Sequence, residues 1–169
     1  LRFNKSIGIL HFKEPIKVSW FGMFTNFDTL LFGINQIIES NIPCELSVIS
    51  SFLELLQKNI TTINKTKITL RLIKWTEKMD KDLIDCDVVI IPYLDDSKRK
   101  VKSSNRIIDA INLGKFVVMS DVHQFKEFKE FCYMGHIGEG LKWVKNNKKS
   151  AKEMLLKGQN YVDKQYSKE

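Results

Sequence analysis

Two kinds of hydrophobic pattern alternate along this chain. Short apolar runs of strand length recur at intervals, at residues 16–21, 45–50, 68–75, 87–92 and 115–120. Between these runs, apolar residues recur three or four positions apart, as expected for one face of a helix. Such helical segments are predicted at residues 27–38, 52–56, 76–86, 105–113, 123–131 and 150–166, with a last short strand or turn within 132–138.

This order of elements predicts the fold class. Strands that are joined by crossover helices are parallel, and their connections are right-handed. Runs as apolar as VVII and FVVM are expected to be covered on both faces. The sequence therefore predicts a three-layer α/β/α Rossmann-like parallel sheet of five or six strands.

The chain divides into one main unit with two flanking segments. Residues 1–15 are expected to be a linker or an edge segment from a preceding domain. Residues 16–149 are expected to form the Rossmann-like domain, and residues 150–169 a C-terminal amphipathic helix. Because the first residue is Leu1, the chain is expected to be part of something longer.

The net charge of +7, with a pI of about 9.3, raises the question of an anionic partner. Most lysines are scattered and mixed with acids, which indicates solvated faces. The exception is a group that converges on one loop, comprising Lys98, Arg99, Lys100, Lys102 and Arg106. No aromatic residues are interleaved with these cations as stacking platforms for bases, so nucleic acid is not the expected partner.

The sequence also indicates a compartment. Apolar runs such as Val88–Ile91 are far too short to span a bilayer, and no signal peptide is visible. The three cysteines, Cys44, Cys86 and Cys132, are widely spaced, which argues against a disulfide framework or a zinc site. We therefore expect core thiols and a cytoplasmic location.

Several familiar catalytic or cofactor motifs are absent. The turn after the first apolar run has a single glycine, Gly22, so the dinucleotide fingerprint fails. There is neither a P-loop nor a nucleophile elbow. His11, His123 and His136 lack metal-binding spacing, so neither a metal nor a cofactor is expected.

The segment between the fourth and fifth apolar runs carries the strongest functional signal. Ser103, Ser104 and Asn105 precede or open a helix, where unpaired amides carry partial positive charge. Lys102 and Arg106 would add two cations, which suits a diphosphate. Asp109 lies three residues after Arg106, on the same side of the helix, where its carboxylate could accept hydrogen bonds from ribose hydroxyls. The alternative for these residues is a helix cap and a surface ion pair.

The stretch KSSNRIIDAINLGKFVVMSD resembles the donor-binding segment of GT-B glycosyltransferases. The resemblance is carried by Asp109-Ala110 and by Gly114 with the strand that follows it. It is close over residues 102–121 and covers residues 16–147 as a fold. The sequence departs from the family pattern in several places: Val101 stands where many members have an acid, residues 102–104 where a Gly-rich turn is usual, and Lys115 where proline is common. The basic pair that usually follows the first strand is also absent.

The resemblance implies a role for each candidate residue. Asp109 would hold the ribose, while Lys102, Arg106 and the amides of residues 102–104 would hold the diphosphate. Gly22 would let the backbone approach the ligand, and Lys74 and Trp75 would border the base.

The resemblance implies the donor-binding half of an enzyme that transfers a sugar from a nucleotide sugar to a glycan or other acceptor, as in polysaccharide biosynthesis. The catalytic base would belong to an N-terminal acceptor domain, so no catalytic residue is assigned here and the isolated domain is expected to be inactive. The alternative is a non-catalytic Rossmann-like module that binds nucleotides or proteins.

Overall fold

The computed structural model describes residues 10–63, 65–78, 81, 83, 85–94 and 103–166. Its centre is a six-stranded parallel sheet with strand order β3-β2-β1-β4-β5-β6. The strands are β1 (Ile16–Phe21), β2 (Cys44–Ser50), β3 (Ile68–Lys74), β4 (Val88–Ile91), β5 (Phe116–Met119) and β6 (Tyr133–Met134). The predicted fold class is therefore confirmed.

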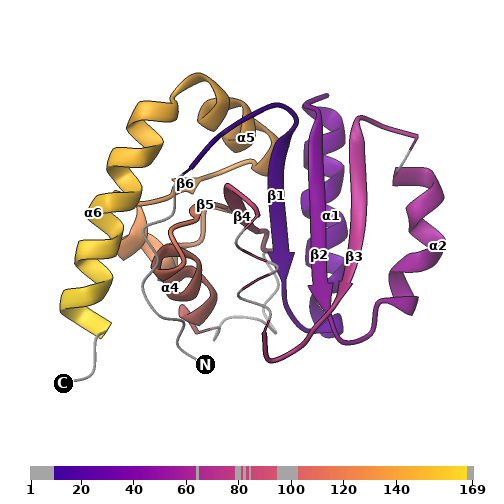
Figure 1. Ribbon diagram of the computed structural model, residues 1–169, viewed down its shortest axis with the longest axis horizontal. Helices are drawn as coiled ribbons and strands as arrows, with labels where there is room; N and C mark the ends of the chain where they lie inside the picture. The colour runs from indigo at the N-terminus through magenta and orange to yellow at the C-terminus, as the bar shows by residue number, and fades with distance from the viewer. Residues whose placement is uncertain are drawn as a thin grey trace.

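Helices cover both faces of the sheet (Figure 1). Helix α1 packs against α5 on one face, whereas α4 packs against α6 on the other, and α2 lies beside the outer strand β3 (Figure 1). Their bounds are α1 (Phe27–Glu39), α2 (Glu54–Ile63), α4 (Asn105–Asn112), α5 (Ile137–Asn146) and α6 (Lys148–Tyr166). Two short 3-10 helices, η1 (Phe24–Asn26) and η3 (His123–Phe128), lie in the connections.

Two helix ends follow from the local chemistry of single residues. Helix α4 ends as Gly114 adopts a φ of 71°, where its amide donates to the Ile111 carbonyl at 2.9 Å. After α1, Asn41 takes a φ of 54°, a conformation that asparagine tolerates better than most residues. Both turns redirect the chain into the next strand.

One helix was not predicted from the sequence, and another predicted helix is only partly described by the structure. Helix α5 was not predicted, because its first turn, Ile137-Gly-Glu-Gly, contains two poor helix formers. The helix predicted at residues 76–86 falls partly outside the described residues; Lys81 and Leu83 are helical, and Leu83 is fully buried. No helix among the described residues has the length and apolar content needed to cross a bilayer.

The core includes all three thiols and a segment that precedes the sheet. Burial raises the pKa of Cys44 to about 12 and that of Cys86 to about 11, and Cys132 is buried as well. Leu10 and Phe12 are also buried. The amides of His11 and Phe12 donate to the carboxylate of the buried Asp87, at 2.8 and 3.0 Å. The segment before β1 is thus fastened to the start of β4.

Lys115, which stands where the GT-B pattern commonly has proline, is held inside the structure by a polar partner. This lysine is only 5% exposed, at the start of β5. Its Nζ donates to the Cys86 carbonyl oxygen at 2.8 Å. A buried ammonium needs such partners, because desolvation without them is costly. Lys115 therefore has a structural role at the edge of the sheet where the strands begin.

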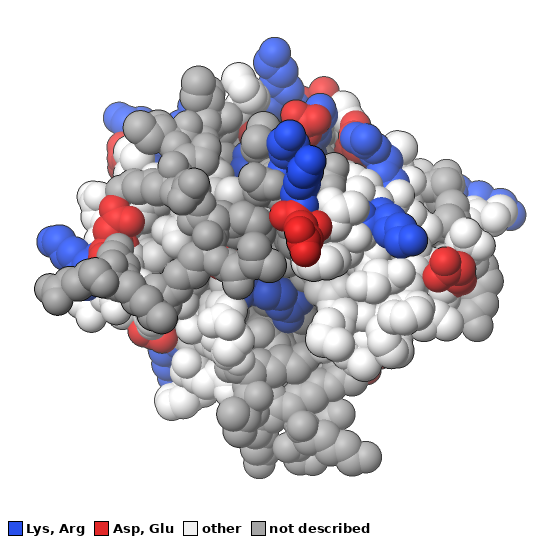
Figure 2. Space-filling model, turned by 60° about the horizontal axis from the view of Figure 1, so that its bottom comes forward, with Lys and Arg blue, Asp and Glu red and all other residues white. Residues whose placement is uncertain are grey.

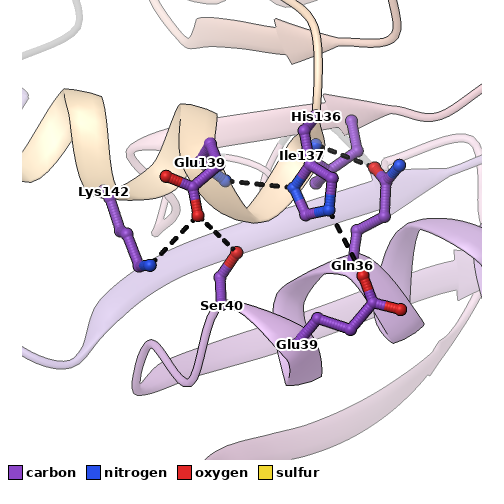
Figure 3. A network of polar contacts seen from close by, with 7 residues as sticks. All are labelled: Gln36, Glu39, Ser40, His136, Ile137, Glu139 and Lys142. Atoms are coloured by element: carbon purple, nitrogen blue, oxygen red, sulfur yellow. Dashed lines mark hydrogen bonds and ion pairs between the residues drawn. The ribbon is translucent and has the colours of Figure 1, made fainter.

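A polar network joins the end of α1 to the start of α5 (Figure 3). The Ile137 amide donates to Gln36 Oε1 at 2.8 Å, and Ser40 Oγ donates to Glu139 Oε1 at 3.1 Å. His136 caps α5, since its Nδ1 accepts from the Glu139 amide at 3.3 Å. The hydrogen bonds from Lys142 and Ser40 hold the pKa of Glu139 below its usual range. This network fixes how α5 lies on α1.

Candidate functional site

The sheet has one topological switch point, between β1 and β4. From β1 the chain proceeds outward to β2 and β3, whereas from β4 it proceeds in the other direction to β5 and β6. Connections leave opposite ways from such a point, so a crevice opens beyond the carboxyl ends of the two strands. In Figure 1 the arrowheads of β1, β2 and β3 point to the bottom of the view, which places this edge there.

A pocket of about 620 Å³ lies at that switch point. Pockets of 300–1,000 Å³ are typical of sites for small-molecule ligands. The loop after each of the four strands β3, β2, β1 and β4 contributes to its wall, and so does the start of α4. The lining residues are Phe21, Gly22, Met23, Asn26, Ser51, Trp75, Tyr93, Ser103 and Arg106.

Arg106 supplies the charge of the pocket. It is the second residue of α4, and its Nη1 donates to the Phe21 carbonyl oxygen at 3.3 Å. Its guanidinium lies over the Tyr93 ring, 5.9 Å from the ring centre. No carboxylate of the described part of the chain lines the pocket. Arginine and the positive end of a helix together favour an anion.

Gly22 keeps the floor of the pocket open. A side chain at this position would place Cβ 3.0 Å from the Trp20 ring and 3.3 Å from Arg106 Nη1. The glycine is held in place by its own backbone, because its amide donates to Ile49 O at 3.2 Å and its carbonyl accepts from Ser50 Oγ at 2.8 Å. The lack of a side chain therefore leaves the backbone at Gly22 accessible from the pocket.

Two aromatic residues shape opposite sides of the pocket. Trp75 follows β3, and its amide donates to Ser50 O at 2.9 Å while 38% of the residue stays exposed. Tyr93 follows β4; its amide donates to Ser120 Oγ at 2.9 Å, and its ring packs on Phe125. An exposed indole held by its backbone can stack on a flat ring.

The structure brings together part of the residue set predicted from the sequence. Gly22, Trp75, Ser103 and Arg106 all line the pocket. Lys102 lies outside the described residues. The remaining predicted residues do not line the pocket, and they are Lys74, Ser104, Asn105 and Asp109.

Each of these four has a definite place. Lys74 is the exposed last residue of β3, and Asn105 is the exposed first residue of α4. Ser104 is the N-cap residue of α4, where its carbonyl accepts from the amides of Ile107 and Ile108. Asp109 is half-buried, one turn further along α4. Its assignment to a ribose stays a prediction.

Sequence reasoning missed several lining residues, among them Met23, Asn26, Ser51 and Tyr93. A simple signal would have found two of them. Ser51 and Tyr93 stand directly after the second and fourth apolar runs, and residues at the carboxyl ends of parallel strands meet at one edge. Met23 and Asn26 carry no such signal, because the path of the loop between β1 and α1 brings them to the pocket.

An apolar rim borders the pocket on the side of β1, β2 and β3. These exposed large side chains come from the loops after the three strands or from the start of α2, and they are Met23, Phe24, Phe52, Leu55 and Trp75. The Phe24 and Phe52 rings meet edge to face, with their centres 4.9 Å apart. Figure 2 looks onto this edge and shows a basic side chain in a hollow near the middle, beside a broad area without charge. We refer to these five residues as the apolar rim.

Comparisons with known proteins address the fold. The sequence matches no protein-family model, and no curated protein matches it. Solved structures do match. TarM matches over 98% of this chain with a TM-score of 0.72 at 16% identity. WaaG, a glycosyltransferase involved in lipopolysaccharide biosynthesis, matches over 91% with a TM-score of 0.64 at 12% identity.

The catalytic domain of cholesterol-alpha-glucosyltransferase from Helicobacter pylori is similar as well, over 88% of this chain and 97% of that one, with a TM-score of 0.67 at 11% identity. The chain spans only 35% of TarM and 44% of WaaG. At these identities the likeness shows a shared fold. The chain thus shares the Rossmann-like fold of these three structures, as the resemblance implied.

Proposed function

We propose that this chain is the donor-binding half of a glycosyltransferase and that its pocket holds the nucleoside diphosphate of a nucleotide sugar. The observation that carries the proposal is the position of Arg106. Its guanidinium lies in the pocket at the switch point, beside Gly22 and the start of α4. An anion bound there would meet a cation, helix amides and an open backbone at once.

Each part of a nucleotide sugar would have a binding partner around the pocket. Arg106, Ser103 and the first amides of α4 would bind the diphosphate, and the exposed face of Trp75 would border the base. Asp109 would reach the ribose from the next turn of α4. In sugar transfer the bond between the anomeric carbon and the diphosphate breaks, so negative charge grows on the leaving diphosphate. Arg106 and the helix start would stabilise that charge.

The acceptor and the catalytic base would come from a second domain of a longer protein. The apolar rim supports this division, because large exposed apolar side chains mark surfaces that other protein surfaces cover. Such a domain would cover the rim and close the pocket. Since the described part of this chain lines the pocket without a carboxylate, it offers no base there, and transfer by this domain alone is not expected.

Calorimetry tests the proposal directly. We expect UDP or GDP to bind this chain, while uridine and guanosine bind far more weakly because they lack the diphosphate. A sugar diphosphate should compete for the same site. The absence of heat with both nucleotides and with their sugar derivatives, at millimolar concentration, would contradict the proposal.

A further inference from the structure

The guanidinium of Arg106 has close neighbours from both strands that flank the switch point. At the end of β1, its Nη1 donates to the Phe21 carbonyl oxygen at 3.3 Å, and the same nitrogen lies 3.3 Å from where a Cβ on Gly22 would stand. After β4, the ring of Tyr93 has its centre 5.9 Å from the guanidinium carbon. Arg106, which comes from α4, therefore contacts the ends of two neighbouring strands.

The ring of Tyr93 is a fixed surface. The residue is only 7% exposed, and its amide donates to Ser120 Oγ at 2.9 Å. Its ring packs on Phe125, with the ring centres 5.4 Å apart. Ser120 directly follows β5, and Phe125 lies in η3. The connection after β5 therefore holds the ring of Tyr93 in place beside Arg106.

A fixed ring matters because an arginine side chain is long and has many rotamers. Ordering such a side chain on binding costs free energy, and a side chain that is ordered beforehand avoids that cost. An aromatic face attracts a guanidinium electrostatically and also stacks on its plane. The guanidinium carries five N–H donors in that plane, so one bond to Phe21 is compatible with two parallel bonds to a phosphate. Tyr93 can thus restrict the guanidinium without using its donors.

We propose that Tyr93 is a positioning residue for the pocket: its ring holds the guanidinium of Arg106 so that the N–H donors are already directed at a bound diphosphate. As far as it concerns the ligand, this inference rests on the proposed function. Tyr93 acts through Arg106, since its amide is bonded to Ser120 and its ring lies against Phe125 and the arginine. The ring is what the proposal requires, so phenylalanine should serve as well as tyrosine, and an aliphatic residue should not.

The first test needs no ligand and follows the Arg106 side chain by NMR. The order parameter of its Nε–H bond reports motion on the picosecond-to-nanosecond scale, and the loss of the signal in Arg106→Ala assigns it. We expect this order parameter to fall in Tyr93→Leu and to stay at the wild-type value in Tyr93→Phe. Arg71, whose side chain is 54% exposed on β3, provides a reference signal that none of these variants should change.

The second test measures UDP or GDP affinity by calorimetry. Tyr93→Leu should weaken binding about 2- to 30-fold, the range of a cation–π contact, whereas Tyr93→Phe should restore it. In an Arg106→Ala protein, Tyr93→Leu should cost no further affinity, because the group that it positions is gone. Phe128→Leu is the control for lost packing: Phe128 is fully buried in η3 and does not line the pocket, so this variant should melt at a lower temperature with its affinity unchanged.

The two tests separate this inference from the proposed function. If the wild type binds neither nucleotide, the proposed function fails, while the order parameter of Arg106 still decides whether Tyr93 holds its side chain. An Arg106 side chain as ordered in Tyr93→Leu as in the wild type would overturn the inference. So would an equal loss of affinity from Tyr93→Leu with and without Arg106, since the tyrosine would then not act through the arginine.

Discussion

At the scale of single residues, the account depends on how little space separates Gly22, Trp20 and Arg106. Trp20 is fully buried, so its ring has no room to move away from the pocket floor. Arg106 is held from two sides, by the Phe21 carbonyl and by the Tyr93 ring. The guanidinium is therefore oriented before any ligand arrives, and less of the binding free energy is lost in ordering it.

This packing predicts the effect of a single methyl group at position 22. In Gly22→Ala the new Cβ would meet the Trp20 ring at 3.0 Å and Arg106 Nη1 at 3.3 Å. Of these two neighbours, the arginine is the one that can shift. We expect nucleotide affinity to fall about tenfold and the free energy of unfolding to fall by about 1–3 kcal/mol. Calorimetry and urea denaturation measure the two effects.

Met23→Ala is a suitable control, because Met23 is the next residue in the same loop and is 64% exposed. Its free energy of unfolding should match that of the wild type. If Gly22→Ala retained both full stability and full affinity, the close approach at the pocket floor would have no functional consequence.

At the scale of elements, the packing of α5 on α1 allows almost no change at Gly138. A Cβ at this position would collide with Ser40 Oγ and with the Gln36 carbonyl oxygen. The two helices would have to separate, which would also disturb the bonds from Ile137 and Ser40 that Figure 3 shows. Gly138, one of the two glycines that hid α5 in the sequence, is thus the residue that lets it approach α1, whereas Gly140 lies against Val118 and Tyr133.

We therefore expect Gly138→Ala to lower the free energy of unfolding by about 1–3 kcal/mol, even though alanine is the better helix former. Urea denaturation monitored by circular dichroism measures the loss. Lys142→Ala is the control on the same helix: it removes only an exposed pair with Glu139 and should cost about 0.5 kcal/mol or less. A Gly138→Ala protein as stable as the wild type would show that α5 is free to shift on α1.

The elements also show what the sequence could reveal. Strands were predictable because each is a short apolar run that the sheet buries, as in β4 and β5. The end of α4 was predictable because Gly114 supplies a left-handed residue. By contrast, α5 was hidden, since Gly138 and Gly140 lower helix propensity and only tertiary packing explains them. The two-residue strand β6 was too short to distinguish from a turn.

For the site, sequence analysis identified the start of α4 and Gly22, but not all of the residues that line the pocket. Arg106 and Gly22 were found because their chemistry can be recognised along the chain. Met23 and Asn26 reach the pocket through the fold of the loop after β1, which leaves no local signal. Ser104 was predicted to be near the diphosphate; its carbonyl accepts from the amides of Ile107 and Ile108, and the residue does not line the pocket.

At the scale of the whole molecule, the distribution of side chains separates two edges of the sheet. The edge where strands begin is closed by structural contacts, such as those of Asp87 with the segment before β1. The edge where strands end carries the pocket, its arginine and the apolar rim. One edge thus serves stability, while the other carries the pocket and the exposed apolar side chains, where we propose that a ligand and a second domain bind.

The most direct test of the central claim is a calorimetric titration of UDP and GDP into Arg106→Ala and into the control Arg71→Ala. Arg71 is another arginine, exposed on β3 and paired with Glu45, so its loss makes the same change in net charge outside the pocket. The account predicts that Arg106→Ala weakens nucleotide binding about 10- to 150-fold, which corresponds to about 1.5–3 kcal/mol for a charge-assisted contact, while Arg71→Ala binds as the wild type does. Equal affinity in the two variants would contradict it.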